Sequence, residues 1–217
     1  MTEEKIEGPD GQTLTVLVDG PSEAQDLVIL APGAGADITH VFMERAAVGL
    51  GAKGLRVCRF NFPYMEAGRK APDRAPVLEG AYRSVLDWTA CLAAKRTFVG
   101  GKSMGGRIAS HVVSQGTEAA GLVFLGYPLH PPGRPDRLRD AHLYDIYVPV
   151  LFVEGSRDPF CPLETLERVR TRIPGHTEVH VVRDGDHSFK VRKSSGRTSD
   201  QAWDEVVEAV TDWIARQ

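Results

Sequence analysis

Cysteine is scarce in this sequence, and so are long apolar runs and an excess of charge of one sign. The 217 residues include three cysteines, Cys58, Cys91 and Cys161, an odd number without a C-x-x-C pair. Neither a disulfide framework nor a zinc site is indicated, and the seven histidines show no metal-binding spacing. We therefore expect reduced thiols, a cytoplasmic location, and neither a metal nor another cofactor.

Charge and hydropathy disfavour two further classes of protein. The net charge of −3 at pH 7 does not favour binding to nucleic acid or to an anionic membrane. The stretch from Met1 to Lys5 is polar and acidic, so no signal peptide is expected. Apolar runs such as Leu27–Pro32 and Val148–Val153 are too short to span a bilayer. The 42% share of apolar residues is typical of a globular protein, and the length fits a single domain over residues 1–217.

Short apolar runs alternate with amphipathic stretches along the chain, which predicts strands that alternate with helices. Runs nearly free of polar residues are typical of parallel strands with both faces covered. They are Leu27–Ala31, Leu55–Arg59, Thr97–Gly100, Leu122–Leu125, Val150–Glu154 and Thr177–Val182. Leu14–Val18 is expected to form an additional, antiparallel strand.

Apolar residues at helical spacing predict the helices between these strands. The expected helices are Val41–Ala52, Val77–Leu92 with Pro76 at its first position, Gly105–Ser114, Leu163–Arg172 and Trp203–Ile214 with Ser199 or Asp200 as its cap. The order predicts an α/β fold with a doubly wound, mostly parallel sheet. In such sheets the functional residues gather in loops at the carboxyl ends of the strands.

A nucleophile elbow is predicted directly after the strand Thr97–Gly100. Gly101-Lys102-Ser103-Met104-Gly105 matches G-x-S-x-G between a strand and a helix, the context that this motif requires. A sharp, strained turn would lift the Ser103 hydroxyl above the sheet edge. Gly101 and Gly105 are small enough to avoid the adjoining strand and helix. The alternative is a glycine-rich turn whose serine only caps a helix.

A serine nucleophile needs a base and a group that orients the base. In the fold that carries this elbow, the expected chain order is serine, then a carboxylate, then histidine. Asp158 follows the strand Val150–Glu154, and His187 follows the strand Thr177–Val182. The order and placement predict a catalytic triad of Ser103, His187 and Asp158. Taken separately, Asp158 could belong to a simple turn and His187 could be a surface histidine.

Three other carboxylates compete with Asp158 for the orienting role. Asp184 and Asp186 lie too close to His187 in sequence to reach its far nitrogen easily, so we expect turn or solvated residues there. Glu154 lies inside a strand and is expected to be an ion-pair partner or, in place of Asp158, the acid.

An oxyanion hole is predicted from the loop Pro32-Gly33-Ala34-Gly35-Ala36. Acyl transfer builds negative charge on the carbonyl oxygen, and backbone N–H groups must already point to it. The expected donors are the N–H groups of Ala34 and Met104. A phosphate-binding loop is disfavoured, because Gly33 and Gly35 lack the third glycine of the dinucleotide motif and Arg96 stands where a P-loop needs glycine.

Loops after two other strands are predicted to border the site. Asn61, Phe62 and Tyr64 follow one strand and Tyr127 follows another, and we expect them at the rim of the pocket. Their rings would form an apolar wall for an acyl or alcohol group. Core packing explains Phe62 and Tyr127 equally well.

Four further residues near the predicted site are expected to have no chemical role. His130 and His142 are expected to be structural or loop-tip histidines. Lys102 is expected to be solvated, with a positive charge at the mouth as the alternative. Cys161 lies near the acid loop, but the elbow carries serine, so a thiol nucleophile is not expected.

These motifs carry a family resemblance over nearly the whole chain. Pro32–Ala36, Arg59–Tyr64, Gly101–Arg107 and Asp184–Phe189 resemble a branch of the α/β-hydrolase superfamily related to dienelactone hydrolases. That branch includes small bacterial proteins and animal relatives of the testis-expressed and chromatin-complex-subunit kind. The resemblance implies a minimal α/β-hydrolase fold without a cap domain. Dienelactone hydrolases proper carry cysteine at the elbow, whereas this chain carries Ser103.

The sequence therefore predicts a serine hydrolase that acts on small carboxylic esters or thioesters through an acyl-enzyme. The alternative is a non-catalytic interaction module on the same fold, as the chromatin-associated relatives suggest. The complete set of Ser103, His187 and Asp158 favours the enzyme, since a binding module need not retain all three. Nothing in the sequence indicates the oligomeric state or the acyl group.

Overall fold

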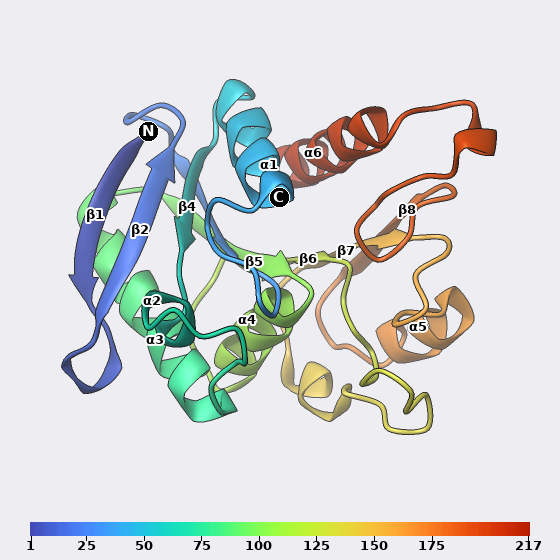
Figure 1. Ribbon diagram of the computed structural model, residues 1–217, viewed down its shortest axis with the longest axis horizontal. Coiled ribbons are helices and arrows are strands. Elements are labelled where there is room, and N and C mark those ends of the chain that lie inside the picture. The colour runs from blue at the N-terminus through green and yellow to red at the C-terminus, as the bar shows by residue number, and fades with distance from the viewer.

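The computed structural model describes residues 1–217 as an α/β structure built on one eight-stranded sheet (Figure 1). The strand order in the sheet is β1-β2-β4-β3-β5-β6-β7-β8. The bounds are β1 Thr2–Glu7, β2 Thr13–Asp19, β3 Asp26–Ala31, β4 Arg56–Phe60, β5 Arg96–Lys102, β6 Gly121–Leu125, β7 Val150–Gly155 and β8 Thr177–Val182. Strands β3 to β8 pair in parallel, and β1 and β2 join the edge in antiparallel pairing. The predicted fold class is confirmed.

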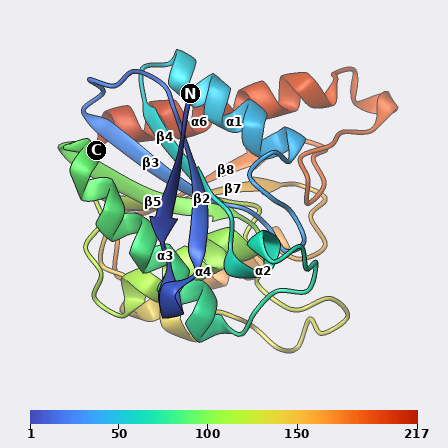
Figure 2. The same cartoon turned by 60° about the vertical axis from the view of Figure 1, so that its left-hand side comes forward.

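Helices cover both faces of this sheet (Figure 2). Their bounds are α1 Val41–Ala52, α2 Pro63–Glu66, α3 Ala75–Thr89, α4 Met104–Ser114, α5 Leu163–Arg170 and α6 Ser199–Arg216. Apolar side chains of α1 and α6 form one core with one face of the sheet, and those of α3, α4 and α5 form a second core with the other face. The central strands are buried on both faces, which explains their nearly continuous apolar sequence.

The predicted strands and longer helices are observed with small shifts of their ends. Strand β1 was not expected, because its sequence is mostly charged. Only Ile6 of this strand is buried, since β1 lies at the sheet edge and pairs with β2 alone. Pro76 is the second residue of α3, and the cap of α6 is Thr198 in place of Ser199 or Asp200. The Thr198 side chain accepts a hydrogen bond from the N–H of Gln201, and the Gln201 side chain accepts one from the N–H of Thr198.

The connection between β6 and β7, where a cap domain would be inserted, is short and mostly irregular. It contains several prolines and one 3-10 helix, η3 Ala141–Asp145. The fold therefore has no separate cap over the carboxyl ends of the strands. Among the helices, none combines the length and the apolar character required to cross a bilayer.

Candidate active site

The serine of the predicted elbow lies in a strained turn between β5 and α4. Ser103 has φ 51° and ψ −113°, a conformation that is rare for residues other than glycine. A Cβ added to Gly101 would lie 2.3 Å from the Ala31 carbonyl oxygen, and one added to Gly105 would lie 2.2 Å from the same atom. Both positions therefore require glycine, because the backbone of β3 passes directly beside the turn.

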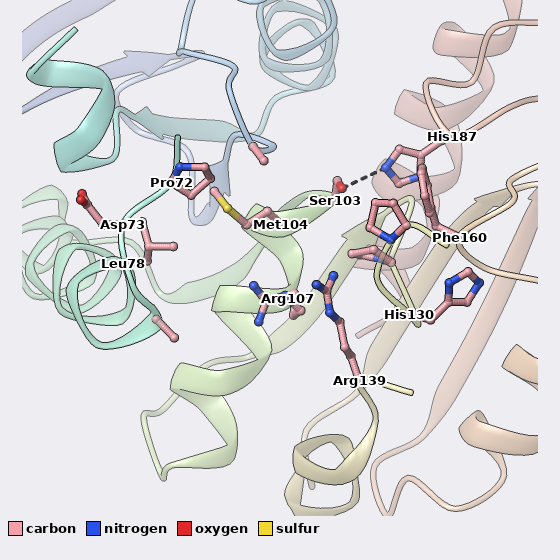
Figure 3. A pocket seen from close by; sticks show the side chains of 14 residues that line it. Pro72, Asp73, Leu78, Ser103, Met104, Arg107, His130, Arg139, Phe160 and His187 are labelled. Atoms are coloured by element: carbon pink, nitrogen blue, oxygen red, sulfur yellow. Dashed lines mark hydrogen bonds between the residues drawn. The ribbon is translucent and has the colours of Figure 1, made fainter. Parts of the chain in front are cut away.

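The structure brings Ser103, His187 and Asp158 into one chain of hydrogen bonds. Figure 3 shows the bond between Ser103 and His187. The Nε2 atom of His187 lies 2.9 Å from Ser103 Oγ, and its Nδ1 atom lies 2.6 Å from Asp158 Oδ2. The Asp158 side chain is fully buried, and its Oδ1 accepts a hydrogen bond of 2.8 Å from the N–H of Phe160. The Phe160 ring meets the His187 ring edge-on, with 4.7 Å between their centroids. These contacts fix the orientation of the imidazole.

The competing carboxylates are bonded to groups other than His187. Asp184 accepts a hydrogen bond of 2.7 Å from Arg192 Nε. Asp186 accepts hydrogen bonds from the N–H groups of Ser188 and Lys190, as expected for a turn residue. Asp158 is thus the carboxylate that contacts His187.

Glu154 is fully buried in β7, the strand that precedes the Asp158 loop. Its Oε1 atom accepts a hydrogen bond of 2.6 Å from the N–H of Tyr127. Burial, and then the negative charge of Asp158, raise the pKa of Glu154 well above its usual value. No basic nitrogen lies within 4.0 Å of its carboxylate oxygens, so the ion pair expected from the sequence is not formed.

The two predicted oxyanion donors lie at the same cavity as Ser103. The backbone N–H groups of Ala34 and Met104 make no hydrogen bond within the protein, and both residues line the cavity. Met104 is the first residue of α4, so its N–H points out of the helix N-terminus. Two hydrogen bonds fix the position of the Ala34 loop. The N–H of Gly35 donates to the Tyr64 hydroxyl at 3.1 Å, and the N–H of Ile38 donates to Asn61 Oδ1 at 3.0 Å.

The four side chains predicted to form the rim of the pocket do not form it. None of Asn61, Phe62, Tyr64 and Tyr127 lines the cavity. The three aromatic side chains are fully buried, since their large apolar surfaces pack into the core under the site. Asn61 and Tyr64 instead hold the Ala34 loop. The loops are placed as the sequence indicated, but their side chains point inward.

A cavity of about 300 Å³ adjoins Ser103 and is walled by both apolar and polar side chains. Its lining residues are Ala34, Pro72, Asp73, Ala75, Leu78, Ser103, Met104, Arg107, Pro128, His130, Pro132, Arg139, Phe160 and His187. Sequence reasoning missed Arg107, Arg139 and Phe160. The signal for Arg107 was its position in the first turn of the helix that follows Ser103, close to the nucleophile in sequence. No sequence signal placed Arg139 here.

His130 was expected to be structural, yet it faces this cavity. Its Nδ1 atom lies 2.9 Å from the carbonyl oxygen of Pro131, while its Nε2 atom is buried without a partner. A proton on Nδ1 would make the first contact a hydrogen bond and leave Nε2 as an unpaired acceptor.

Lys102 is directed inward, so the expectation of a solvated side chain is wrong. Its Nζ atom donates a hydrogen bond of 2.5 Å to the carbonyl oxygen of His187 and lies 5.3 Å from the centroid of the Phe189 ring. Burial lowers the pKa of Lys102 to about 8. The side chain ties the histidine loop to the elbow strand.

A second serine–histidine pair lies in the packing between α4 and η3, outside the cavity. Ser110 Oγ lies 2.8 Å from His142 Nε2, and Ser110 is fully buried. Burial is the main cause that lowers the pKa of His142 to about 3. The structural role expected for His142 fits these contacts.

Comparison with known proteins agrees with this architecture. Residues 24–215 match the alpha/beta hydrolase domain family, so the chain belongs to the α/β-hydrolases. A serine hydrolase without a lid from Xanthomonas campestris is 19% identical, with 98% of this chain and 94% of that one covered and a TM-score of 0.75. A dienelactone hydrolase from Anabaena variabilis is 18% identical, with 99% and 97% covered and a TM-score of 0.78. Est1E from Butyrivibrio proteoclasticus with bound ferulic acid is 16% identical, with 99% and 98% covered and a TM-score of 0.77.

Proposed function

We propose that this protein is a serine hydrolase of small carboxylic esters or thioesters, with Ser103 as nucleophile, His187 as base and Asp158 as the orienting acid. The observation that carries the proposal is the continuous hydrogen-bond chain from Asp158 through His187 to Ser103, which opens into a cavity. An isolated hydroxyl is a weak nucleophile, and this arrangement is the one that activates it.

The chemistry follows from the positions of these groups. As Ser103 Oγ attacks the carbonyl carbon, its proton passes to His187 Nε2, and the buried Asp158 stabilises the imidazolium. The negative charge on the carbonyl oxygen is bound by the N–H groups of Met104 and Ala34. His187 then donates the proton to the departing alcohol or thiol, which leaves an acyl group on Ser103. A water molecule, deprotonated by His187, releases the acid and restores the serine.

The similar structures support an ester as the reacting group. Est1E is seen with ferulic acid, a carboxylic acid, and the relative from Xanthomonas campestris is a serine hydrolase without a lid. The cavity of about 300 Å³ lies at the small end of ligand pockets, which favours a small substrate. The motif resemblance further suggests the dienelactone-hydrolase-like branch with its animal relatives. That placement and a cytoplasmic location stay predictions from the sequence.

Covalent labelling tests the proposal directly. A fluorophosphonate probe should react with Ser103, and mass spectrometry of the labelled peptide should identify it. Ser103→Ala should abolish labelling, whereas Ser110→Ala should leave Ser103 labelled, because Ser110 lies outside the cavity.

A folded wild-type protein that reacts with no probe and hydrolyses no member of an ester and thioester panel would refute this proposal. That result would favour the alternative of a non-catalytic interaction module. Labelling that persists in Ser103→Ala would show that another residue is the nucleophile.

A further inference from the structure

Two arginine side chains lie in the cavity beside the reacting groups. Arg107 lies on α4, one helical turn after Ser103, and Arg139 lies in the loop before η3. Figure 3 shows the two guanidinium groups reaching the same part of the cavity. Burial lowers the pKa of Arg139, and the nearby charge of Arg107 lowers it further. This end of the cavity is therefore cationic.

Neither guanidinium group has an acidic partner. No carboxylate oxygen lies within the 4.0 Å of an ion pair from either one. Arg107 has a single side-chain contact, 3.4 Å from its Nη1 to His111 Nε2, and its Nε atom is buried without a partner. The guanidinium group of Arg139 makes no hydrogen bond. Most of their N–H donors are thus free to bind an anion.

The nearby carboxylates of Asp73 and Glu79 are bonded to residues other than the two arginines, and only Asp73 Oδ2 lacks a partner. Asp73 also lines the cavity, but its Oδ1 atom accepts a hydrogen bond of 2.7 Å from Arg69, and Figure 3 shows its carboxyl group turned away from the two arginines. Glu79 lies 3.0 Å from His111 Nδ1 and accepts a second hydrogen bond from Gln115. The repulsion between the two guanidinium groups is therefore not neutralised within the protein, and a bound anion would relieve it.

We propose that Arg107 and Arg139 form a subsite for a carboxylate, and that the substrate is a small ester or thioester that carries a second, anionic group. This inference rests on the hydrolase function proposed above and narrows its substrate class. Guanidinium groups bind carboxylates through paired, charge-assisted hydrogen bonds. The subsite shares one cavity with Ser103, so one small molecule can contact both. Leu78, Met104 and Phe160 line the same cavity and suit a short apolar segment between the two groups.

Matched esters test the subsite by turnover. The probes are p-nitrophenyl hydrogen glutarate, whose acyl part is anionic, and p-nitrophenyl pentanoate, its neutral counterpart. A second pair, 4-acetoxybenzoate and phenyl acetate, places the charge on the leaving group. The wild type should favour the anionic member of at least one pair in kcat/KM, and the favoured pair shows which side of the ester carries the charge.

The ratio of kcat/KM for the anionic to the neutral ester should fall in both arginine variants. We expect a fall of about tenfold to hundredfold in Arg139→Gln and in Arg107→Gln, because each change removes charge-assisted hydrogen bonds. Arg137→Gln is the matched control: Arg137 is an exposed residue of the same loop that does not line the cavity, so the ratio should not change. Thermal unfolding of each variant identifies any that fails to fold.

Binding without turnover separates this inference from the hydrolase proposal. Calorimetric titration should show that Ser103→Ala binds monomethyl glutarate but not dimethyl glutarate, which has no charge. The double variant Ser103→Ala/Arg139→Gln should bind neither compound. This result supports the subsite even if no ester is hydrolysed. If neutral esters are hydrolysed as fast as anionic ones and monomethyl glutarate does not bind, the subsite is refuted while the hydrolase proposal stands.

Discussion

At the scale of single residues, His187 depends on Asp158 for its orientation. The carboxylate is fully buried and lies 2.6 Å from His187 Nδ1, so it sets which ring nitrogen carries the proton. In Asp158→Asn the amide would hold the imidazole in the wrong tautomer. We expect kcat for an activated ester to fall by about 10⁴-fold while the fold is retained.

Asp184→Asn provides the comparison for this prediction. Asp184 lies in the same loop as His187 but is bonded to Arg192, so the loss of its charge should change kcat far less. Near-normal kcat in Asp158→Asn would contradict the assignment and transfer the role to Glu154.

Tyr64 holds the loop that carries Ala34, the proposed oxyanion donor, without lining the cavity beside Ser103. Its hydroxyl accepts a hydrogen bond of 3.1 Å from the N–H of Gly35, next to the predicted donor Ala34. Tyr64→Phe keeps the ring in the core but releases the loop. We expect kcat to fall by up to about tenfold with little change in KM, because the oxyanion forms only in the transition state.

The split between kcat and KM distinguishes positioning from a general loss of structure. Tyr147→Phe, which changes an exposed tyrosine, should leave both constants unchanged. A Tyr64→Phe protein with wild-type kcat and an unchanged rate of fluorophosphonate labelling would show that the hydrogen bond has no role in positioning.

At the scale of elements, the close approach of β3, β5 and α4 depends on the elbow glycines. A Cβ at Gly105 would lie 2.2 Å from the carbonyl oxygen of Ala31, and neither backbone can move without displacing its strand or helix. We expect Gly105→Ala to lower the free energy of unfolding by about 1–3 kcal/mol or more. The midpoint of urea unfolding measures this change.

Gly80→Ala is the control within another helix. Gly80 lies in α3, and a Cβ there would meet only the Pro9 side chain at 3.3 Å. Alanine also favours the helical conformation by roughly 0.5–1 kcal/mol over glycine. The effect of Gly80→Ala on the midpoint should therefore be much smaller, and equal losses in the two variants would argue against a special constraint at the elbow.

At the scale of the whole molecule, no cap domain covers the site, so only the loops around it can enclose a substrate. The only helix in the connection between β6 and β7 is the short η3, and 22% of the His187 side-chain surface is exposed to solvent. We expect weak discrimination among short, neutral p-nitrophenyl esters that differ only in acyl length, because an uncapped site buries little of the substrate. We also expect no increase in rate at the micellar threshold of longer esters.

Rates for esters of increasing acyl length, measured below and above that threshold, test this expectation. A steep preference for one long chain, or a clear increase in rate above the threshold, would mean that a segment closes over the site.

The sequence by itself determined the order of the elements and the position of the candidate triad. Parallel strands covered on both faces are mostly apolar, so β3 to β7 could be recognised from their apolar runs. Strand β8 lies at the other edge of the sheet and is only partly buried. The elbow could be recognised because its motif is contiguous in the sequence, between a strand and a helix. The contacts that require its glycines come from β3, a neighbouring strand, and only the structure shows them. Strand β1 could not be recognised, since an edge strand with one buried residue carries no apolar pattern.

Only the tertiary structure decided which side chains face the cavity beside Ser103. Phe62, Tyr64 and Tyr127 follow their strands as expected, but the free energy gained by burying their rings turns them into the core. Arg107 and Arg139 come from separate elements, and no local pattern in the sequence relates them. Their meeting at one cavity depends on how η3 packs against α4, a contact between segments that are distant in the chain.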